Sequence, residues 1–174
     1  EEPHYLESFI ESIFNSLPGV QGGVLIVGGD GRYGNRRAIN VILGMAAAHG
    51  ISKVITTVDG ILSTPAASNL IRRTQSIGGI ILSASHNSGG LDGDFGVKIN
   101  GSNGGPASEG LTDEIFACSK NLEGYKKLIE YESINIDSPG KYQIGSMAVE
   151  VIDGIDDYLS LMQKLFDFDQ ISSF

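Results

Sequence analysis

The sequence has little of the chemistry that stabilises small secreted proteins. It contains one cysteine, Cys118, so no disulfide can form within the chain, and a lone thiol favours a reducing compartment. Tryptophan is absent, and only five of the 174 residues are proline. A chain of this length buries about 70% of the surface that its unfolded form exposes, enough for a core without disulfides. We therefore expect a single domain over residues 1–174, with Cys118 as a small core residue.

Basic residues are scarce as well. Lysine and arginine number 12 against 21 acidic residues, and the formal net charge at pH 7 is -9. Because the basic residues form no cluster, the sequence predicts neither nucleic-acid binding nor binding to an anionic membrane. No apolar run approaches the roughly 20 residues that span a bilayer, and the start Glu-Glu-Pro is unlike a signal peptide. These features predict a cytoplasmic protein in which any phosphate ligand is held by a few local groups.

Glycine, by contrast, is abundant. The chain has 24 glycines in 174 residues, about twice the usual share. They show no three-residue period, which excludes a collagen-like chain, and a hydrophobic content of 41% argues against disorder. Glycine costs backbone entropy on folding, so a folded chain carries it where the backbone needs freedom. Nine of the glycines lie between Gly78 and Gly105, and this cluster marks the segment to inspect.

Apolar periodicity predicts alternating helices and strands. Helical spacing predicts helices over 5–17, from a capping Asn35 to about 49, from Ser63 or Thr64 to about 76, over 109–122 and over 155–166. Short apolar or β-branched runs predict strands over 24–27, 53–58, 80–82 and 97–100. The stretch 131–147 is predicted to be irregular or extended. Strands that alternate with helices are typical of a layered α/β domain.

A polar, glycine-rich loop follows the third predicted strand. It offers the hydroxyl of Ser85, the imidazole of His86, the amide of Asn87 and, further on, the amine of Lys98. In open α/β sheets ligands bind beyond the carboxyl ends of strands, and successive loop amides can bind anions. Neither the P-loop pattern nor the serine-hydrolase pattern is present. From the residues alone, phosphoryl chemistry and a connection that merely satisfies its own backbone both remain open.

Several strings resemble the first domain of the α-D-phosphohexomutase family. They are Val-Gly-Gly-Asp-Gly-Arg at 27–32, Gly-Ile-Leu-Ser-Thr-Pro-Ala at 60–66, Ala-Ser-His-Asn at 84–87, Asp-Phe-Gly-Val-Lys at 94–98, Asn-Gly-Gly-Pro-Ala at 103–107 and Leu-Phe-Asp-Phe at 165–168. The fourth and fifth strings are most similar to the phosphoglucomutases of this family. The resemblance implies a layered α/β/α domain whose mixed, mainly parallel sheet is flanked by helices. It also implies a fragment of a four-domain protein about three times longer.

The resemblance implies roles for five residues. Ser85 would carry a phosphoryl group, exchange it with glucose 1-phosphate or glucose 6-phosphate through glucose 1,6-bisphosphate, and help to hold Mg²⁺ through a phosphate oxygen. The other metal ligands would lie outside this chain. His86 would act near the phosphoryl group, Lys98 would transfer a proton with the sugar hydroxyl, and Asn87 would shape the loop beside the substrate. Arg32 would either reach a substrate anion or pair with Asp30 or another carboxylate.

The sequence also departs from the family pattern. Ser83 replaces the usual threonine and keeps a hydroxyl, whereas Ser88 replaces the usual proline and leaves the loop freer. Asp92 and Asp94 resemble a metal motif, but the family's metal loop lies in another domain, so we expect Asp94 to be structural. The remaining domains of the same protein are the implied partners, and the isolated domain is expected to be inactive. A non-catalytic phosphoglucomutase-like scaffold or secretion-related protein is the main alternative, and a simple phosphate-binding module is a third.

Overall fold

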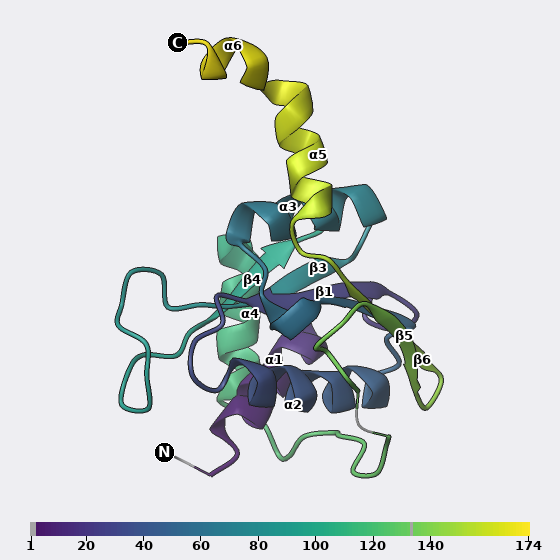
Figure 1. Ribbon diagram of the computed structural model, residues 1–174. Helices are drawn as coiled ribbons and strands as arrows, with labels where there is room; N and C mark the ends of the chain where they lie inside the picture. Colours follow the sequence, from purple (N-terminus) through teal and green to yellow (C-terminus); the bar gives the residue numbers. More distant parts are fainter. Residues whose placement is uncertain (1–2, 133) are drawn as a thin grey trace.

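The computed structural model describes residues 3–132 and 134–174 and is built around one six-stranded sheet of order β4-β3-β1-β2-β6-β5 (Figure 1). Strands β3, β1, β2 and β6 are mutually parallel, while the edge strands β4 and β5 run antiparallel to their neighbours. The expected mixed, mainly parallel sheet is confirmed. The strands are β1 (Val24–Gly29), β2 (Lys53–Thr57), β3 (Gly78–Leu82), β4 (Val97–Gly101), β5 (Gly140–Ile144) and β6 (Met147–Ile152).

Helices cover both faces of this sheet. Helices α1, α2 and α4 lie on one face, and α3 lies on the other with α5 packed against it (Figure 1). The helices are α1 (Tyr5–Ser16), α2 (Asn35–Ala48), the short 3-10 helix η1 (Val58–Gly60), α3 (Thr64–Thr74), α4 (Glu109–Ser119), α5 (Asp156–Leu165) and α6 (Phe168–Ser172). The molecule is therefore a three-layer α/β/α domain. No helix in the described part of the chain is both long and apolar enough to cross a membrane.

The central strand β1 is apolar on both faces because both faces are covered. Leu25 and Val27 point into the larger core under α1 and α2, and Ile26 points into the smaller core under α3. All three side chains are fully buried. A parallel strand that is buried on both faces has an unbroken apolar run in its sequence, and for this reason the run at 24–27 predicted a strand.

The stretch 131–147, expected to be irregular or extended, is extended in its second half, but its pairing into a sheet was not predicted. Strand β5 and strand β6 form a hairpin there, with a tight turn at Gly145, whose φ of +59° suits glycine. The usable signal was the two-residue alternation in β6, where Met147, Val149 and Val151 are buried and Ala148 is exposed. Because β6 also pairs in parallel with β2, it is an interior strand of the sheet, and β5 forms the edge.

Two local predictions are also corrected. Asn35 does not cap α2, since Gly34 occupies that position, and the Asn35 amide instead donates to the Gly60 carbonyl at 3.2 Å. Cys118 is only partly buried, because α4 lies at the margin of its layer and buries only Ile115. The cap of α3 is Ser63, one of the two candidates, and its hydroxyl accepts a hydrogen bond from the backbone of the first turn.

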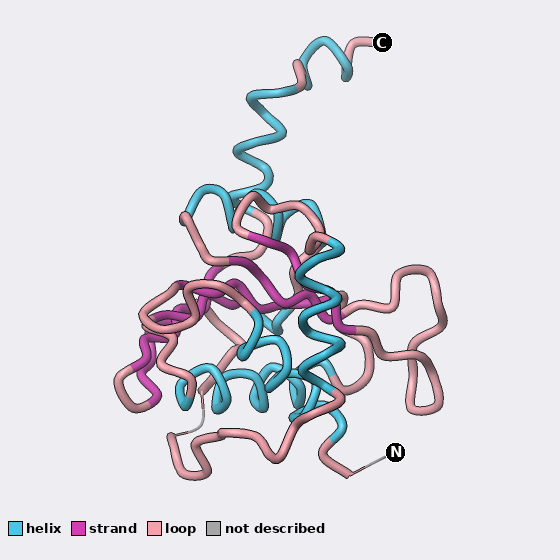
Figure 2. The backbone as a smooth tube through the Cα atoms, turned by 180° about the vertical axis from the view of Figure 1, so that it is seen from behind, coloured by secondary structure: helices cyan, strands magenta, loops and turns pink. Residues whose placement is uncertain are grey.

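Helix α5 extends away from the sheet and carries α6 at its far end (Figures 1 and 2). None of its residues is fully buried. Asp157 fastens its first turn to α3, because its carboxylate accepts from the Asn69 amide at 2.7 Å and pairs with Arg73. The predicted last helix is present, but polar contacts at its first turn attach it to the domain.

Candidate active site

Three turns meet where β1, β2 and β3 reach their carboxyl ends. The Leu62 backbone N–H donates to the Gly29 carbonyl at 2.8 Å, and the Asp30 N–H donates to the Leu82 carbonyl at 3.1 Å. The long loop 83–96 then leaves this edge, visible as the large projecting loop in Figures 1 and 2, and it is closed at its base by a 2.9 Å bond from the Ser83 N–H to the Gly96 carbonyl. Such an edge is where open α/β sheets bind ligands.

Ser85 lies exposed at the start of this loop and contacts Lys98. Its φ of +56° lies in the left-handed region, which is uncommon for a residue other than glycine. Its backbone N–H donates to the Ser83 hydroxyl at 3.1 Å. The Lys98 ammonium donates to the Ser85 hydroxyl at 2.5 Å, from strand β4 on the opposite arm of the loop. The structure therefore brings together the predicted phosphoryl carrier and the predicted proton-transfer amine.

Asn87 and Asp94 tie the two arms of the loop to each other. The Asn87 side-chain amide donates to the Asp94 carboxylate at 2.8 Å, and the Asp94 N–H donates to the Ser88 carbonyl at 2.9 Å. Asp94 is thus placed where a structural role was expected. His86 is exposed, and its ring makes no hydrogen bond with the residues that the structure describes, so it stands beside the carrier without a fixed partner.

Arg32 lies at the base of the loop, and each nitrogen of its guanidinium group donates a hydrogen bond. Nε and Nη2 form a bidentate pair with the Asp30 carboxylate, with the Nη2–Oδ2 distance at 2.8 Å. Nη1 donates to the Asp94 backbone carbonyl at 2.5 Å. Only 7% of the Arg32 side chain is exposed. Of the two predicted alternatives, this geometry favours pairing with Asp30 over an open contact with an anion.

The carboxyl group of Asp30 responds strongly to this pairing. The hydrogen bonds from Arg32 lower the pKa of Asp30 from 3.8 to about 2, against an opposing effect of burial and with a smaller contribution from the Ser83 hydroxyl. Asp30 is therefore ionised throughout the neutral range. Sequence reasoning named Asp30 only as a possible partner, and it missed the bond from Arg32 to Asp94 altogether, because 62 positions separate those two residues.

The Asn-Gly-Gly-Pro-Ala string does not join the site. Strand β4 runs back along β3, so the turn at 101–107 lies at the opposite edge of the sheet from Ser85. There the Asn100 amide donates to the Gly104 carbonyl at 2.9 Å and to the Ser68 hydroxyl of α3 at 3.2 Å. This string supports α3 and the sheet edge, although it was one of the strongest marks of resemblance.

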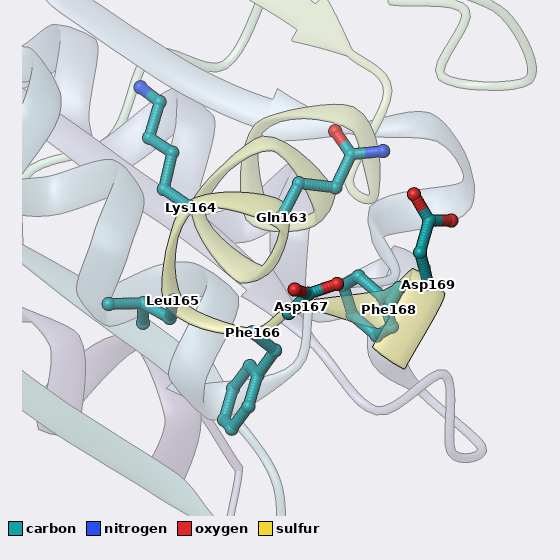
Figure 3. A pocket seen from close by; sticks show the side chains of 7 residues that line it. All are labelled: Gln163, Lys164, Leu165, Phe166, Asp167, Phe168 and Asp169. Carbon is teal, nitrogen blue, oxygen red and sulfur yellow. The ribbon is translucent and has the colours of Figure 1, made fainter. Parts of the chain in front are cut away.

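The described part of the chain also has two hollows, one beside the loop and one at the bend between α5 and α6. A cleft of about 1410 Å³ borders the loop and is lined by the starts of α1 and α2, by Arg32 and by loop residues such as Leu91 and Phe95. A second hollow, of about 600 Å³, lies at the α5–α6 bend and is lined only by Gln163–Asp169 (Figure 3). Figure 3 shows its side chains splaying outward from one bent segment. It contains none of the predicted residues, so the loop edge remains the candidate site.

A divalent metal finds few ligands in this chain. Within residues 3–132 and 134–174, no three histidine, cysteine, aspartate or glutamate side chains are grouped as a metal site requires. Asp94 and Asp30, the two carboxylates that hold the loop in the bonds described above, are already paired with Asn87 and Arg32. The residues present therefore do not hold Mg²⁺ by themselves.

Comparisons with known proteins agree on one family. Residues 1–126 match the family model described as phosphoglucomutase/phosphomannomutase, alpha/beta/alpha domain I. The phosphoglucomutase of Rhizobium radiobacter is 50% identical over 99% of this chain, and that of Schizosaccharomyces pombe is 46% identical over all of it. A Paramecium structure, named as the exocytosis-sensitive phosphoprotein parafusin (phosphoglucomutase) in its open form, superposes with a TM-score of 0.91 at 45% identity over 97% of the chain. The chain spans about a third of the length of these relatives, from 31% to 33%.

Proposed function

Because the chain belongs to the phosphoglucomutase/phosphomannomutase family and contains its α/β/α domain I, we propose that it is the phosphoserine-bearing domain of a longer phosphoglucomutase. The longer protein would interconvert glucose 1-phosphate and glucose 6-phosphate through glucose 1,6-bisphosphate. The observation that carries this proposal is the 2.5 Å contact between Lys98 Nζ and Ser85 Oγ at the carboxyl edge of the sheet.

The proposed step exchanges one phosphoester for another. The bond between phosphorus and Ser85 Oγ breaks, a new bond forms between phosphorus and a sugar hydroxyl oxygen, and the proton of that hydroxyl passes to Ser85 Oγ. In the reverse direction Ser85 Oγ takes a phosphoryl group from the bisphosphate. Little net energy is involved, so catalysis depends on positioning and on charge stabilisation. Lys98 is proposed to transfer the hydroxyl proton, because its amine lies beside the oxygen at which the exchange occurs.

The neighbouring residues have supporting roles in this proposal. His86 follows the carrier, is exposed and has no competing hydrogen bond with the described residues, so its imidazole is free to approach the transferred group. Asn87 holds the loop through Asp94 and would lie beside the substrate. Mg²⁺ would neutralise phosphate charge when bound. Since this chain would contribute only the phosphate oxygen on Ser85, the other ligands are proposed to come from the remaining domains, in a cytoplasmic enzyme.

A second candidate function is a non-catalytic relative that acts in secretion or as a scaffold. Two observations favour it: Ser88 replaces the usual proline beside the carrier, and the Paramecium relative is named an exocytosis-sensitive phosphoprotein. The same name includes phosphoglucomutase, and the Ser85–Lys98 contact is intact. We therefore place the enzyme first.

Turnover measurements separate these candidates. In the longer protein, conversion of glucose 1-phosphate to glucose 6-phosphate should require Ser85 and be stimulated by glucose 1,6-bisphosphate and Mg²⁺. The Ser85→Ala variant should lose turnover, and the 174-residue chain alone should have none because its described part contains no metal cluster. Turnover by the chain alone would contradict the need for other domains. An inactive longer protein with degraded metal and sugar loops would favour the scaffold.

A further inference from the structure

Ser85 adopts a backbone conformation that its surroundings must maintain. A non-glycine residue in the left-handed region is strained and persists only where neighbouring contacts hold it. Ser85 is nevertheless exposed, on a loop rich in glycine, where such support is expected to be weak. The local bond from its N–H to the Ser83 hydroxyl fixes one side only. The conformation therefore calls for a further source of support.

Arg32 supplies that support from a different part of the chain. Its guanidinium joins Asp30, whose N–H is bonded to the last carbonyl of β3, to the backbone carbonyl of Asp94 on the returning arm of the loop. The Asp94 carboxylate in turn accepts from Asn87, two positions after Ser85. An unbroken series of hydrogen bonds thus runs from the end of β1 to both arms of the loop that carries Ser85.

We propose that the Asp30–Arg32 pair is a positioning unit that holds Ser85 in its orientation for phosphoryl transfer and does not contact the substrate. This inference rests on the proposed function. All three guanidinium nitrogens already donate to protein oxygens, and 7% of the side chain is exposed, so the Nε–Nη2 fork that would clamp a phosphate is already engaged by Asp30. Bidentate pairing with a carboxylate and a third donor to a carbonyl require the planar fork of arginine, which lysine lacks.

Two substitutions at Arg32 separate the contribution of its positive charge from that of its planar fork. Arg32→Lys keeps the positive charge but cannot form the fork, while Arg32→Gln loses both. Asp30→Asn removes the carboxylate charge from the other side of the pair. Arg72→Gln is the matched control, because Arg72 is exposed near the end of α3, at the sheet edge opposite Ser85, and its side chain forms no ion pair within the described residues.

In the longer protein, both Arg32 variants should lower kcat by about 100-fold, as expected for a displaced reacting group. The KM for glucose 1-phosphate should stay within about twofold of the wild-type value, because no substrate contact is lost. In the 174-residue chain, the same variants and Asp30→Asn should speed amide hydrogen exchange at 84–96 while exchange in β1 and β3 is unchanged. Arg72→Gln should match the wild type in both measurements.

The opposite pattern would overturn the inference. If Arg32→Lys keeps wild-type kinetics and Arg32→Gln raises KM, Arg32 binds a substrate anion. If exchange at 84–96 is the same in Arg32→Gln and wild type, the pair does not hold the loop. The hydrogen-exchange measurement does not depend on turnover. An inactive wild-type protein would therefore refute the proposed function, and the exchange rates would still show whether Arg32 holds the loop.

Discussion

Lys98 Nζ lies 2.5 Å from Ser85 Oγ although the two residues are 13 positions apart. The contact depends on the antiparallel register of β3 and β4, in which Lys98 pairs with Ile81. A slip of one residue would turn Lys98 to the other face of the sheet, because side chains alternate along a strand. The backbone pairing of the sheet edge thereby determines which amine faces the serine.

Replacing Lys98 should remove proton transfer and leave the fold intact. Lys98→Gln keeps a polar side chain of similar length but cannot exchange the proton, so the rate of phosphoryl transfer should fall by about 10²–10⁴-fold. The rate is measured in the longer protein by single-turnover transfer from Ser85. Lys141→Gln is the control, because Lys141 is exposed on the edge strand β5, across the sheet from β4. Equal rates for Lys98→Gln and wild type would contradict the assigned role.

Gly29 lies at the point where the strands open into the site, and it should tolerate no side chain. A Cβ there would come within 2.3 Å of the Leu82 carbonyl oxygen and 2.5 Å of Asn35 Oδ1. Gly29→Ala should therefore reduce the free energy of unfolding by about 1–3 kcal/mol. Gly110→Ala in α4 meets nothing within 4 Å and should be neutral or stabilising by up to about 1 kcal/mol. Urea unfolding measures both, and equal destabilisation would contradict the packing.

A buried pair between α1 and the end of α2 should matter for stability. The Glu11 carboxylate contacts His49 Nε2 at 2.8 Å and accepts from the Lys126 N–H at 2.9 Å, with both side chains almost fully buried. Glu11→Ala removes the acceptor of the Lys126 N–H and the partner of the His49 ring at a buried position, so we expect a loss of about 1–3 kcal/mol. Glu114→Ala removes an exposed carboxylate from α4 and should change stability by less than about 0.5 kcal/mol. Similar thermal midpoints for the two variants would exclude a stabilising role of the pair.

Stability in acid should report on Asp30. Its folded pKa of about 2 lies below its ordinary 3.8, so the ionised group stabilises the folded state above the ordinary value, and this contribution is lost as the pH falls toward 2. Wild type should therefore lose more stability than Asp30→Asn between about pH 5 and about pH 2. Urea titrations across that interval measure the difference. Parallel curves for the two proteins would mean that the Arg32 pairing does not lower the pKa of Asp30.

The layers and most elements of the fold could be predicted because their patterns are local. The apolar run of β1 reflects burial on both faces, and the serine cap of α3 reflects its first turn. The hairpin β5–β6 was missed because its stretch was interpreted as irregular or extended and was given no partner strand, although Met147, Val149 and Val151 alternate with less buried residues. Cys118 was placed in the core because an apolar helical stretch does not reveal how far its layer extends.

The candidate site was predictable only in its residue types. The family resemblance named Ser85 and Lys98, and the structure adds that the two side chains touch. The bond from Arg32 to the Asp94 carbonyl joins segments 62 positions apart and involves a backbone atom, so no side-chain pattern encodes it. The Asn-Gly-Gly-Pro-Ala turn marks the family without belonging to the candidate site, because it lies at the far edge of the sheet.

The central claim is that Ser85 carries the phosphoryl group, and intact mass spectrometry tests it most directly. The longer protein is incubated with glucose 1,6-bisphosphate and weighed before and after, followed by peptide mapping. The account predicts that wild type gains the mass of one phosphoryl group on the peptide containing Ser85, while Ser85→Ala gains none. Labelling of Ser85→Ala to the same extent as wild type would contradict it.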